Sequence, residues 1–453
     1  MADGRLAVTI DDGMGAVDDP IRHPVAYART LRGWSQGDFA TVLDRVARRH
    51  GLRSGADKTA VSRWENWRKT PNLESQLLIA EAFDVPITDV EAYGWPYWLP
   101  GRDEPLPLGA AYTVRALHDA QRASMDRRSF MTYSATSLAG LASQWATIEP
   151  GRLVSAFGGK RVDPELVDWL EDTSAKLTAL PTEQRQHTIR LMDAHLATVT
   201  ELIEDGRYSE ATGRRLHLLA ASLATAGGWY RFDHGRHWAA GKLWGAALQS
   251  AHAAGDRDHG AGVLSDFAYQ ANWLGEPKIS VEQLGFALSG TGHPTARSLL
   301  FLRRARAHAA LGDRSACYRD LSQAEDALGV HAADPAPDWC AWMSPADLAV
   351  DSGQCLLDLG RTEEAHVRII EGMALLPQAR DKTRGIFLTY QAKGHLRSND
   401  IEQALALTGE SLDLATRIGA PRCVTLVRDL APAFTAYRQV DGVAEFLERL
   451  RAS

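Results

Sequence analysis

The chain has 453 residues, of which 45% are hydrophobic and 24% are charged. A chain of this length and composition forms two or three soluble globular domains, which excludes global disorder. It contains no run of eighteen apolar residues, so we expect no membrane-spanning helix and no membrane partner. The four cysteines form no CxxC pair, which predicts reduced, buried thiols and a cytoplasmic location.

Charge is unevenly distributed along the chain, whose net charge is −7. Residues 22–70 hold eleven Lys or Arg and four Asp or Glu, a net charge of +7, so the remainder carries −14. This asymmetry favours binding of nucleic acid through one end of the molecule. Residues 1–21 are acidic and unlike a secretory signal, and we interpret them as a mobile arm.

The basic stretch predicts two helices separated by a break, and then a third helix. Residues 25–40 hold an apolar helical segment, a break at Gly33, and Ser35 as the N-cap of a helix beginning at Gln36. The third helix follows Asp57, whose carboxylate suits an N-cap. This order of elements is the helix-turn-helix plan.

The third predicted helix has a buried edge and a basic outer face. Val61 and Trp64 lie three residues apart, which places both on the apolar edge. Side chains that form hydrogen bonds occupy the rest of its first two turns and the turn beyond: Lys58, Thr59, Ser62, Arg63, Arg68 and Lys69. In the major groove such a helix reads bases, and cations just beyond it bind phosphates. The alternative is a short amphipathic helix with a solvated basic face.

This region resembles the XRE family, the Cro and phage-repressor class of helix-turn-helix proteins. The matching residues are Ser35-Gln36, Phe39-Ala40, Val61 to Glu65, Thr70-Pro71 and Leu73-Glu74. The resemblance implies that Gln36 caps the second helix near a phosphate and that Glu65 is structural. It also implies a homodimer on an inverted repeat of double-stranded DNA. The candidate DNA-binding residues are Gln36, Lys58, Thr59, Ser62, Arg63, Asn66, Arg68 and Lys69.

The chain departs from the family pattern in two places. Ala40 and Ser62 are 22 positions apart, roughly double the family spacing. Residues 43–55 are the addition, so either the second helix is longer or a loop projects there. Where the family usually leaves the third helix on a glycine, this chain has Trp67, so we expect Asn66 to adopt the left-handed cap.

A further amphipathic helix is predicted over residues 73–83, followed by a stiff linker. Four prolines and four aromatic residues between Tyr93 and Pro107 indicate that linker. A connecting helix is expected over residues 126–146. We therefore divide the chain into an arm, a helix-turn-helix domain, a linker with its connecting helix, and a repeat domain: residues 1–21, 22–92, 93–162 and 163–453.

From residue 163 the chain predicts helix after helix, and hence an all-α fold. Turns are expected at five positions: Gly235, Gly275, Gly312, Gly360 and Asn399. A small residue stands seven positions before each turn, where two helices approach closely: Gly228, Ala268, Ala305, Gly353 and Ala392. With the alanines that follow several turns, at Ala240, Ala365 and Ala404, these features resemble tetratricopeptide repeats of about 34 residues.

The resemblance to tetratricopeptide repeats implies a curved solenoid whose first helices line a concave binding face. Positions counted back from the turns predict the residues on that face: Trp229, Asp233, Tyr269, Asn272, Trp273, Arg306, Asp347 and Gln354. Trp339, Trp342 and Met343 are expected to close one end of the groove. Aromatic residues mixed with a few charges suit a small molecule or a short peptide. The alternative is that these aromatic residues pack between neighbouring repeats.

Signatures of catalysis and metal binding are weak. His234 and His237 have HxxH spacing, but no third ligand stands nearby. The chain has no HExxH motif, no nucleophile elbow and no dinucleotide fingerprint. We therefore expect no enzymatic activity, no metal and no cofactor.

The whole arrangement resembles the actinobacterial XRE regulators with repeats, and more distantly the RRNPP peptide-sensing regulators. It implies a sequence-specific transcription regulator whose repeat domain dimerises and senses a small molecule or peptide. The alternative is an adaptor whose repeats bind another protein while the helix-turn-helix tethers it to DNA. An effector that changes the curvature of the solenoid would alter the distance between the two recognition helices.

Overall fold

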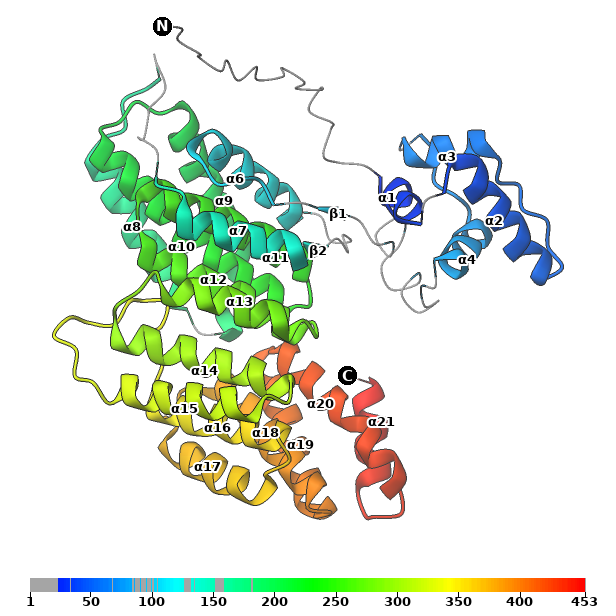
Figure 1. The fold of residues 1–453 in the computed structure, drawn as a ribbon. Helices are drawn as coiled ribbons and strands as arrows, with labels where there is room; N and C mark the ends of the chain where they lie inside the picture. The colour runs from blue at the N-terminus through cyan, green and yellow to red at the C-terminus, as the bar shows by residue number, and fades with distance from the viewer. Residues whose placement is uncertain are drawn as a thin grey trace, which may run out of the picture. The chain divides into compact units, whose positions relative to one another are not determined.

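The computed structural model describes residues 23–32, 34–66, 68–83, 85, 90, 95, 99, 102–103, 105–125, 132–133, 135–150, 159–180 and 182–452. These residues are mostly helical, and the strands among them, β1 (Arg102–Asp103) and β2 (Thr132–Tyr133), pair with each other. The chain divides into two compact units (Figure 1): residues 1–104 with 130–132, and residues 105–129 with 133–453. The predicted arm, Gly33, Trp67 and most of the predicted linker lie outside the described residues.

The first unit contains the predicted helices, which are α1 (Pro24–Leu31), α2 (Gln36–Arg49), α3 (Lys58–Glu65) and α4 (Leu73–Ala82). The predicted caps are confirmed. Ser35 and Asp38 exchange two hydrogen bonds as a capping box at α2, and the Asp57 carboxylate accepts from the Ala60 N–H at 2.6 Å. The boundaries of these helices therefore follow from local capping chemistry.

The core of the first unit holds the apolar edge of α3 against α1 and α2. Val61 is fully buried and Trp64 is 4% exposed, as predicted. They belong to one apolar cluster with Phe39 and Phe83, whose ring centroids are 5.0 Å apart. Burial of this edge leaves the opposite side of α3 to solvent.

The residues added between the second and third helices are used in both of the expected ways. Helix α2 continues for 14 residues to Arg49, and Gly51 then turns the chain with a φ of 69° into the segment that leads to α3. The prediction for Asn66 was wrong, because its φ is −101°. Its backbone and side-chain N–H groups both bond the Ser62 carbonyl, the latter at 2.7 Å, so the helix ends in right-handed geometry.

The second unit is built from the remaining helices. They are α6 (Ala110–Met125), α7 (Ala135–Thr147), α8 (Pro164–Thr178), α9 (Thr182–Asp205), α10 (Glu210–Asp233), α11 (His237–Ala254), α12 (Arg257–Trp273), α13 (Pro277–Leu288), α14 (Pro294–Ala310), α15 (Arg314–Leu328), α16 (Pro345–Asp358), α17 (Thr362–Leu375), α18 (Asp381–Arg397), α19 (Ile401–Ile418), α20 (Pro421–Phe434), the 3₁₀ helix η1 (Thr435–Tyr437) and α21 (Val443–Ala452). Within the described residues, no helix is long and apolar enough to cross a membrane. The four cysteines are buried and form no disulfide, as predicted.

Helices α6 and α7 lie in residues 93–162, which were assigned from the sequence to the linker and connecting helix. In the structure both helices pack into the second unit. Helix α6 lies on α11, and α7 lies on α12 and α13. Trp145 of α7 is 1% exposed, and its ring occupies the space that a Cβ on Gly260 or Gly290 would need. These two helices are therefore part of the core of the second unit.

From α10 to α19 the helices pack most closely in successive pairs: α10 with α11, α12 with α13, α14 with α15, α16 with α17, and α18 with α19. The five predicted turn residues close the first helix of each pair with a left-handed φ between 59° and 82°. Two of the five predicted close approaches are confirmed, those at Gly228 and Gly353. The Trp244 indole lies where a Cβ on Gly228 would stand, 2.3 Å from its Nε1. The first helices of neighbouring pairs contact one another, α12 with α14, α14 with α16, and α16 with α18.

Candidate functional site

Helix α3 presents a row of polar side chains to solvent. Lys58, Thr59 and Arg63 are exposed, and Ser62 is half-buried. Because Val61 and Trp64 anchor the opposite edge, the four polar residues are held on the outer side of the first two turns. Side chains placed in this way can reach the edges of bases in a major groove.

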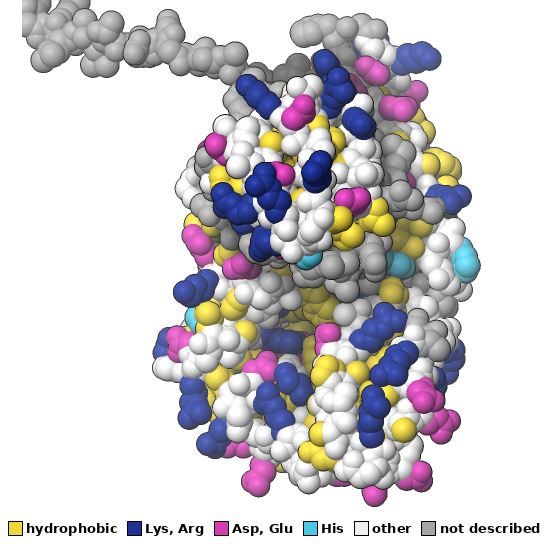
Figure 2. Space-filling model, turned by 90° about the vertical axis from the view of Figure 1, so that its right-hand side faces the viewer, with side chains coloured by type: hydrophobic (Ala, Val, Ile, Leu, Met, Phe, Trp, Pro, Cys, Tyr) yellow, Lys and Arg dark blue, Asp and Glu magenta, His cyan; other side chains and the backbone are white. Residues whose placement is uncertain are grey.

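The cations of this surface differ from Arg48 and Arg49 of the same unit in having no acidic partner among the described residues. Arg48 pairs with Asp44 at 2.7 Å, and Arg49 pairs with Glu81 at 3.4 Å. No carboxylate of the described residues lies within ion-pair distance of Lys58, Arg63, Arg68 or Lys69, all of which are exposed. Figure 2 shows Lys and Arg side chains gathered over the first unit. Unpaired surface cations suit contact with phosphates.

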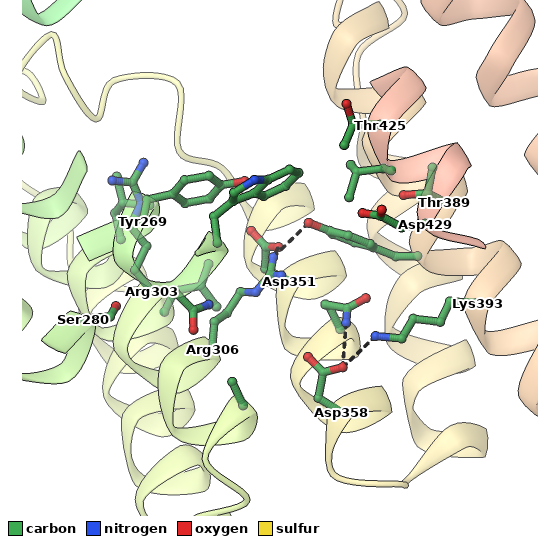
Figure 3. A pocket seen from close by; sticks show the side chains of 18 of the residues that line it. Tyr269, Ser280, Arg303, Arg306, Asp351, Asp358, Thr389, Lys393, Thr425 and Asp429 are labelled. Carbon is green, nitrogen blue, oxygen red and sulfur yellow. Dashed lines mark hydrogen bonds and ion pairs between the residues drawn. The ribbon is translucent and has the colours of Figure 1, made fainter. Parts of the chain in front are cut away.

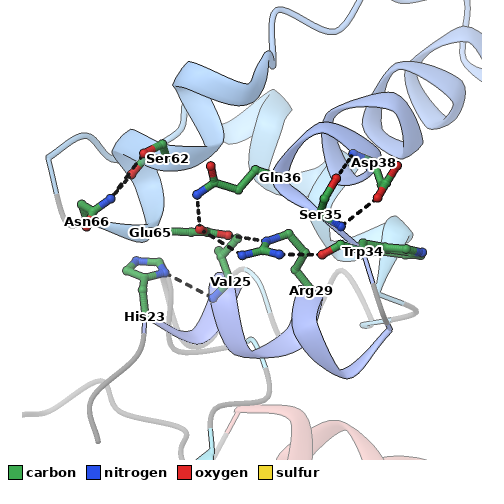
Figure 4. Close-up of polar contacts among 10 residues, drawn as sticks. All are labelled: His23, Val25, Arg29, Trp34, Ser35, Gln36, Asp38, Ser62, Glu65 and Asn66. Atoms are coloured by element: carbon green, nitrogen blue, oxygen red, sulfur yellow. Dashed lines mark hydrogen bonds and ion pairs between the residues drawn. The ribbon is translucent and has the colours of Figure 1, made fainter. Parts of the chain in front are cut away.

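Gln36 and Glu65 lie in a hydrogen-bonded network that joins α1, α2 and α3 (Figure 4). The Glu65 carboxylate accepts from Arg29 Nε at 2.7 Å and from Gln36 Nε2 at 2.6 Å. The Glu65 side chain is 7% exposed and that of Arg29 is 15% exposed. The network fixes α3 against the N-terminus of α2, and one N–H group of the Gln36 amide is engaged inside the unit.

Asn66 is also engaged within the unit. Its amide donates to the Ser62 carbonyl, and its nitrogen lies 3.4 Å from the Ser62 hydroxyl oxygen. Of the candidate DNA-binding residues, the exposed and unpaired cations are therefore best placed to contact a polyanion, and Gln36 and Asn66 position the helix that carries them.

Comparison with known families recognises the same part of the chain. Residues 29–87 match the model of the SP15 N-terminal domain. The matched segment runs from α1 beyond the end of α4 and so contains the whole of α2 and α3. None of the curated proteins matched the chain.

The second unit contains a cavity of about 630 Å³ (Figure 3). Its wall is formed mainly by the first helices of the pairs and by α20. Tyr269 and Arg303 extend into it from α12 and α14, and Thr425 and Asp429 lie on the opposite side on α20. Five of the predicted ligand-binding residues line it: Tyr269, Asn272, Trp273, Arg306 and Gln354. Trp342, predicted to close the groove, is also in the wall.

Three predicted ligand-binding residues do not line this cavity. Trp229 donates from Nε1 to the Asp266 carboxylate at 2.9 Å, and its ring packs on Tyr269. Asp347 accepts two hydrogen bonds of 2.8 Å from Arg380.

Asp233, the third, accepts a hydrogen bond from Lys382 and pairs with Arg422 at 3.4 Å. Counting back from a turn locates a residue along its helix. This count does not determine whether the side chain faces the cavity or a neighbouring helix. From the sequence, Trp229, Asp233 and Asp347 therefore could not be distinguished from the five residues that do line the cavity.

Several polar residues of the cavity were not predicted: Arg303, Asp351, Asp358, Tyr390, Lys393 and Asp429. A signal was present in the spacing. Asp351, Gln354 and Asp358 stand at intervals of three and four residues on α16, so their side chains share one face. Arg303 and Arg306 on α14 show the same three-residue interval, as do Tyr390 and Lys393 on α18.

A half-buried ion pair joins α14 to α16 in the cavity wall. Arg306 donates to the Asp351 carboxylate at 2.5 Å and to the Tyr390 hydroxyl at 3.0 Å. Burial raises the pKa of Asp351, although the Arg306 guanidinium opposes that effect. Burial also raises the pKa of Tyr390. The two charges therefore stabilise each other in a partly desolvated position.

A second pair joins α16 to α18. Lys393 donates to the Asp358 carboxylate at 2.8 Å, and Gln354 Nε2 donates to it at 3.0 Å. Burial acts to raise the pKa of Asp358, but Lys393 and the hydrogen bonds outweigh burial, so the pKa is lowered. Asp358 is therefore held in its charged form. The two pairs place fixed charges on three helices around the cavity. No three His, Cys, Asp or Glu of the described residues are grouped to hold a metal ion.

Acidification is expected to destabilise the second unit, because two of its histidines are held in their neutral form: His217, which is buried, and His237, which is half-buried. Burial lowers the pKa of His217 and of His237 to about 4. The unfolded chain takes up these protons near its ordinary pKa of about 6.5, so each histidine costs about 2 kcal/mol between about pH 7 and pH 5. Asp266 offsets part of this loss, because burial raises its pKa to about 6. The folded chain therefore binds this proton more readily than the unfolded chain, and the contribution of Asp266 to stability increases as the pH falls.

Thermal unfolding of the full chain at neutral and acidic pH measures this effect. Wild type should unfold at a markedly lower temperature at acidic pH than at neutral pH. His217→Gln should reduce this difference between the two unfolding temperatures. Exposed His331 supplies the control, and His331→Gln should leave the difference unchanged. A midpoint that rises on acidification would contradict the expectation.

Proposed function

We propose that the chain is a sequence-specific transcription regulator that binds DNA through α3. The observation that carries the proposal is the outer face of α3. Lys58, Thr59 and Arg63 are exposed there, the two cations have no acidic partner among the residues that the structure describes, and the apolar edge is anchored in the core. The first two turns of a groove-reading helix need such side chains. Arg68 and Lys69, just beyond the helix, suit phosphates.

The proposal assigns a helix-turn-helix to α2 and α3 and a tetratricopeptide-like repeat array to the pairs from α10 onward. Two copies of the chain would join through the repeat region and place two α3 helices on an inverted repeat. An effector, a small molecule or a short peptide, would occupy the cavity between the first helices. Its binding would shift those helices and alter the spacing of the two α3 helices, to which fixed half-sites are sensitive.

Selection of DNA fragments by the purified full chain at near-physiological salt tests the proposal. Wild type should enrich an inverted repeat, and Lys58→Ala with Arg63→Ala should abolish that enrichment, because each groove contact contributes about 1–3 kcal/mol. Lys69→Ala should weaken binding to all sequences by a similar factor.

The control removes the same charge from another part of the first unit. Arg48→Ala with Arg49→Ala eliminates two cations that already have acidic partners, and should preserve the selected sequence. An equal loss of sequence enrichment in the two double variants would mean that DNA binding depends only on the overall charge of the first unit. Absence of enrichment by wild type, with and without added cell extract, would oppose a sequence-specific regulator.

An adaptor is the second candidate, and exposed apolar residues on α17 favour it. Val367 is 57% exposed, Ile370 is 53% exposed and Leu375 is 60% exposed. Such a group of side chains on one short helix suits contact with another protein. Purification of a stable complex with a cellular protein, lost in Val367→Asp, would support the adaptor, whereas stabilisation by a small molecule would support the sensor.

A further inference from the structure

The wall of the cavity in the second unit carries three cations and three carboxylates, but one of these carboxylates has no cationic partner among the described residues. Each cation in the wall has a carboxylate partner: Arg303 with Asp266 at 3.0 Å, Arg306 with Asp351 at 2.5 Å, and Lys393 with Asp358 at 2.8 Å. Asp266 lies behind the wall, and the other residues line the cavity. One further carboxylate, that of Asp429, also lines it and is left over.

Asp429 stands on α20, one helical turn after Thr425, and both are at the cavity (Figure 3). No described residue forms a hydrogen bond or an ion pair with its carboxylate. Asp429 is an exposed residue of the cavity wall, and partial burial of its carboxyl group raises its pKa without opposition from any cation of the described residues. A carboxylate in this position favours a positively charged group on whatever occupies the cavity.

Gln354 supplies a second, independent observation. The residue is 3% exposed and lines the cavity. Its Nε2 donates to Asp358 at 3.0 Å, which fixes the orientation of the amide. The Oε1 atom has no hydrogen-bond partner among the described residues, and the same holds for Oδ1 of Asn272. Buried acceptors without a donor are costly, so both oxygens favour a ligand that brings N–H or O–H groups.

The remaining cation near the site does not neutralise Asp429. Arg422 is 9% exposed and is absent from the cavity wall. Its guanidinium lies against the rings of Tyr269 and Trp229 and pairs with Asp233. Aromatic rings of the wall, Tyr269, Trp273, Trp342 and Tyr390, offer apolar surface for the body of a ligand.

We propose that the cavity binds an organic cation, with an ammonium group at Asp429 and further N–H or O–H donors at Gln354 and Asn272. The inference deepens the proposed sensor function by naming the chemical class of the effector. Binding itself is independent of DNA. A chain that bound the cation but no operator would refute the regulator and leave the ligand assignment intact.

Calorimetric titration of the full chain with three probes of equal length tests the proposal. The probes are octamethylenediamine, which carries two ammonium groups, octamethylene glycol, which carries donors without charge, and suberate, which carries two carboxylates. We expect the diamine to bind most tightly, the glycol more weakly, and suberate not at all. Preference for suberate, or binding of none of the probes, would overturn the proposal.

Variants locate the binding within the cavity. Asp429→Asn preserves shape and should weaken diamine binding about tenfold while leaving the glycol unaffected. Gln354→Met, which removes the amide acceptor, should weaken both. Asp441→Asn changes an exposed aspartate outside the cavity and should alter neither. An Asp429→Asn variant that binds the diamine as wild type does would overturn the assignment of the ammonium group.

Discussion

Replacing Glu65 with alanine should release α3 from the rest of the first unit. The substitution leaves the Arg29 guanidinium, only 15% exposed, without its carboxylate, and it removes the acceptor of the Gln36 amide. Loss of one partner of a largely buried ion pair costs about 3 kcal/mol, a large part of the stability of a small domain. Hydrogen exchange of the full chain, followed by mass spectrometry, should show faster exchange in α1, α2 and α3.

The exposed pair of Asp44 with Arg48 provides the matched control. Its side chains are 39% and 77% exposed, and such pairs contribute less than about 1 kcal/mol. Asp44→Ala should therefore leave exchange in these helices nearly unchanged. Equal protection of α3 in Glu65→Ala and wild type would mean that the apolar edge alone holds the helix.

Adding a methyl group at Gly228 and at its neighbour Gly227 should have opposite effects on the second unit. A Cβ at Gly228 would lie 2.3 Å from Nε1 of Trp244, whose side chain is fully buried. Displacing that ring costs about 1–3 kcal/mol. A Cβ at Gly227 meets its nearest atoms at 3.5 Å, an ordinary contact, so Gly227→Ala should gain up to about 1 kcal/mol of helix propensity.

Thermal unfolding of the two variants measures the difference, and each serves as the control for the other because both lie in α10. Gly228→Ala should unfold several degrees below wild type, and Gly227→Ala at or above it. Near-ultraviolet circular dichroism should also change in Gly228→Ala, because Trp244 packs against Trp229 and Phe267. If Gly228→Ala and Gly227→Ala unfold at the same temperature, the close approach of the two helices does not limit the stability of the second unit.

Local chemistry made much of the fold predictable from the sequence. The caps at Ser35 and Asp57 act over three residues, so reading them required no tertiary information. Turn residues such as Gly235 and Asn399 were equally predictable from the sequence, because a left-handed backbone conformation restricts the residue type. The prediction of a left-handed cap at Asn66 was wrong because the Asn66 side-chain amide donates a hydrogen bond to the Ser62 carbonyl at the end of the helix. A left-handed cap was not needed to provide a donor for that carbonyl.

The candidate cavity was predictable only in part. Tyr269 and Gln354 were found because their distance from a turn places them on a first helix. Asp347 satisfied the same rule but turns toward Arg380, since a helix of the array faces several neighbours at once. Asp429 was missed because α20 follows the last predicted turn and approaches the cavity only through the folding of the whole unit.

The contacts of Asp233 have a consequence for cooperativity. Its partners Lys382 and Arg422 stand on α18 and α20, and Lys382 is 149 positions away in the sequence. In a linear array each repeat contacts only its neighbours, so terminal repeats can unravel independently. Here an early helix is tied to two late ones, so loss of the C-terminal helices exposes charges on α10 and opens the cavity wall. The second unit should therefore melt as one body, with its two ends supporting each other.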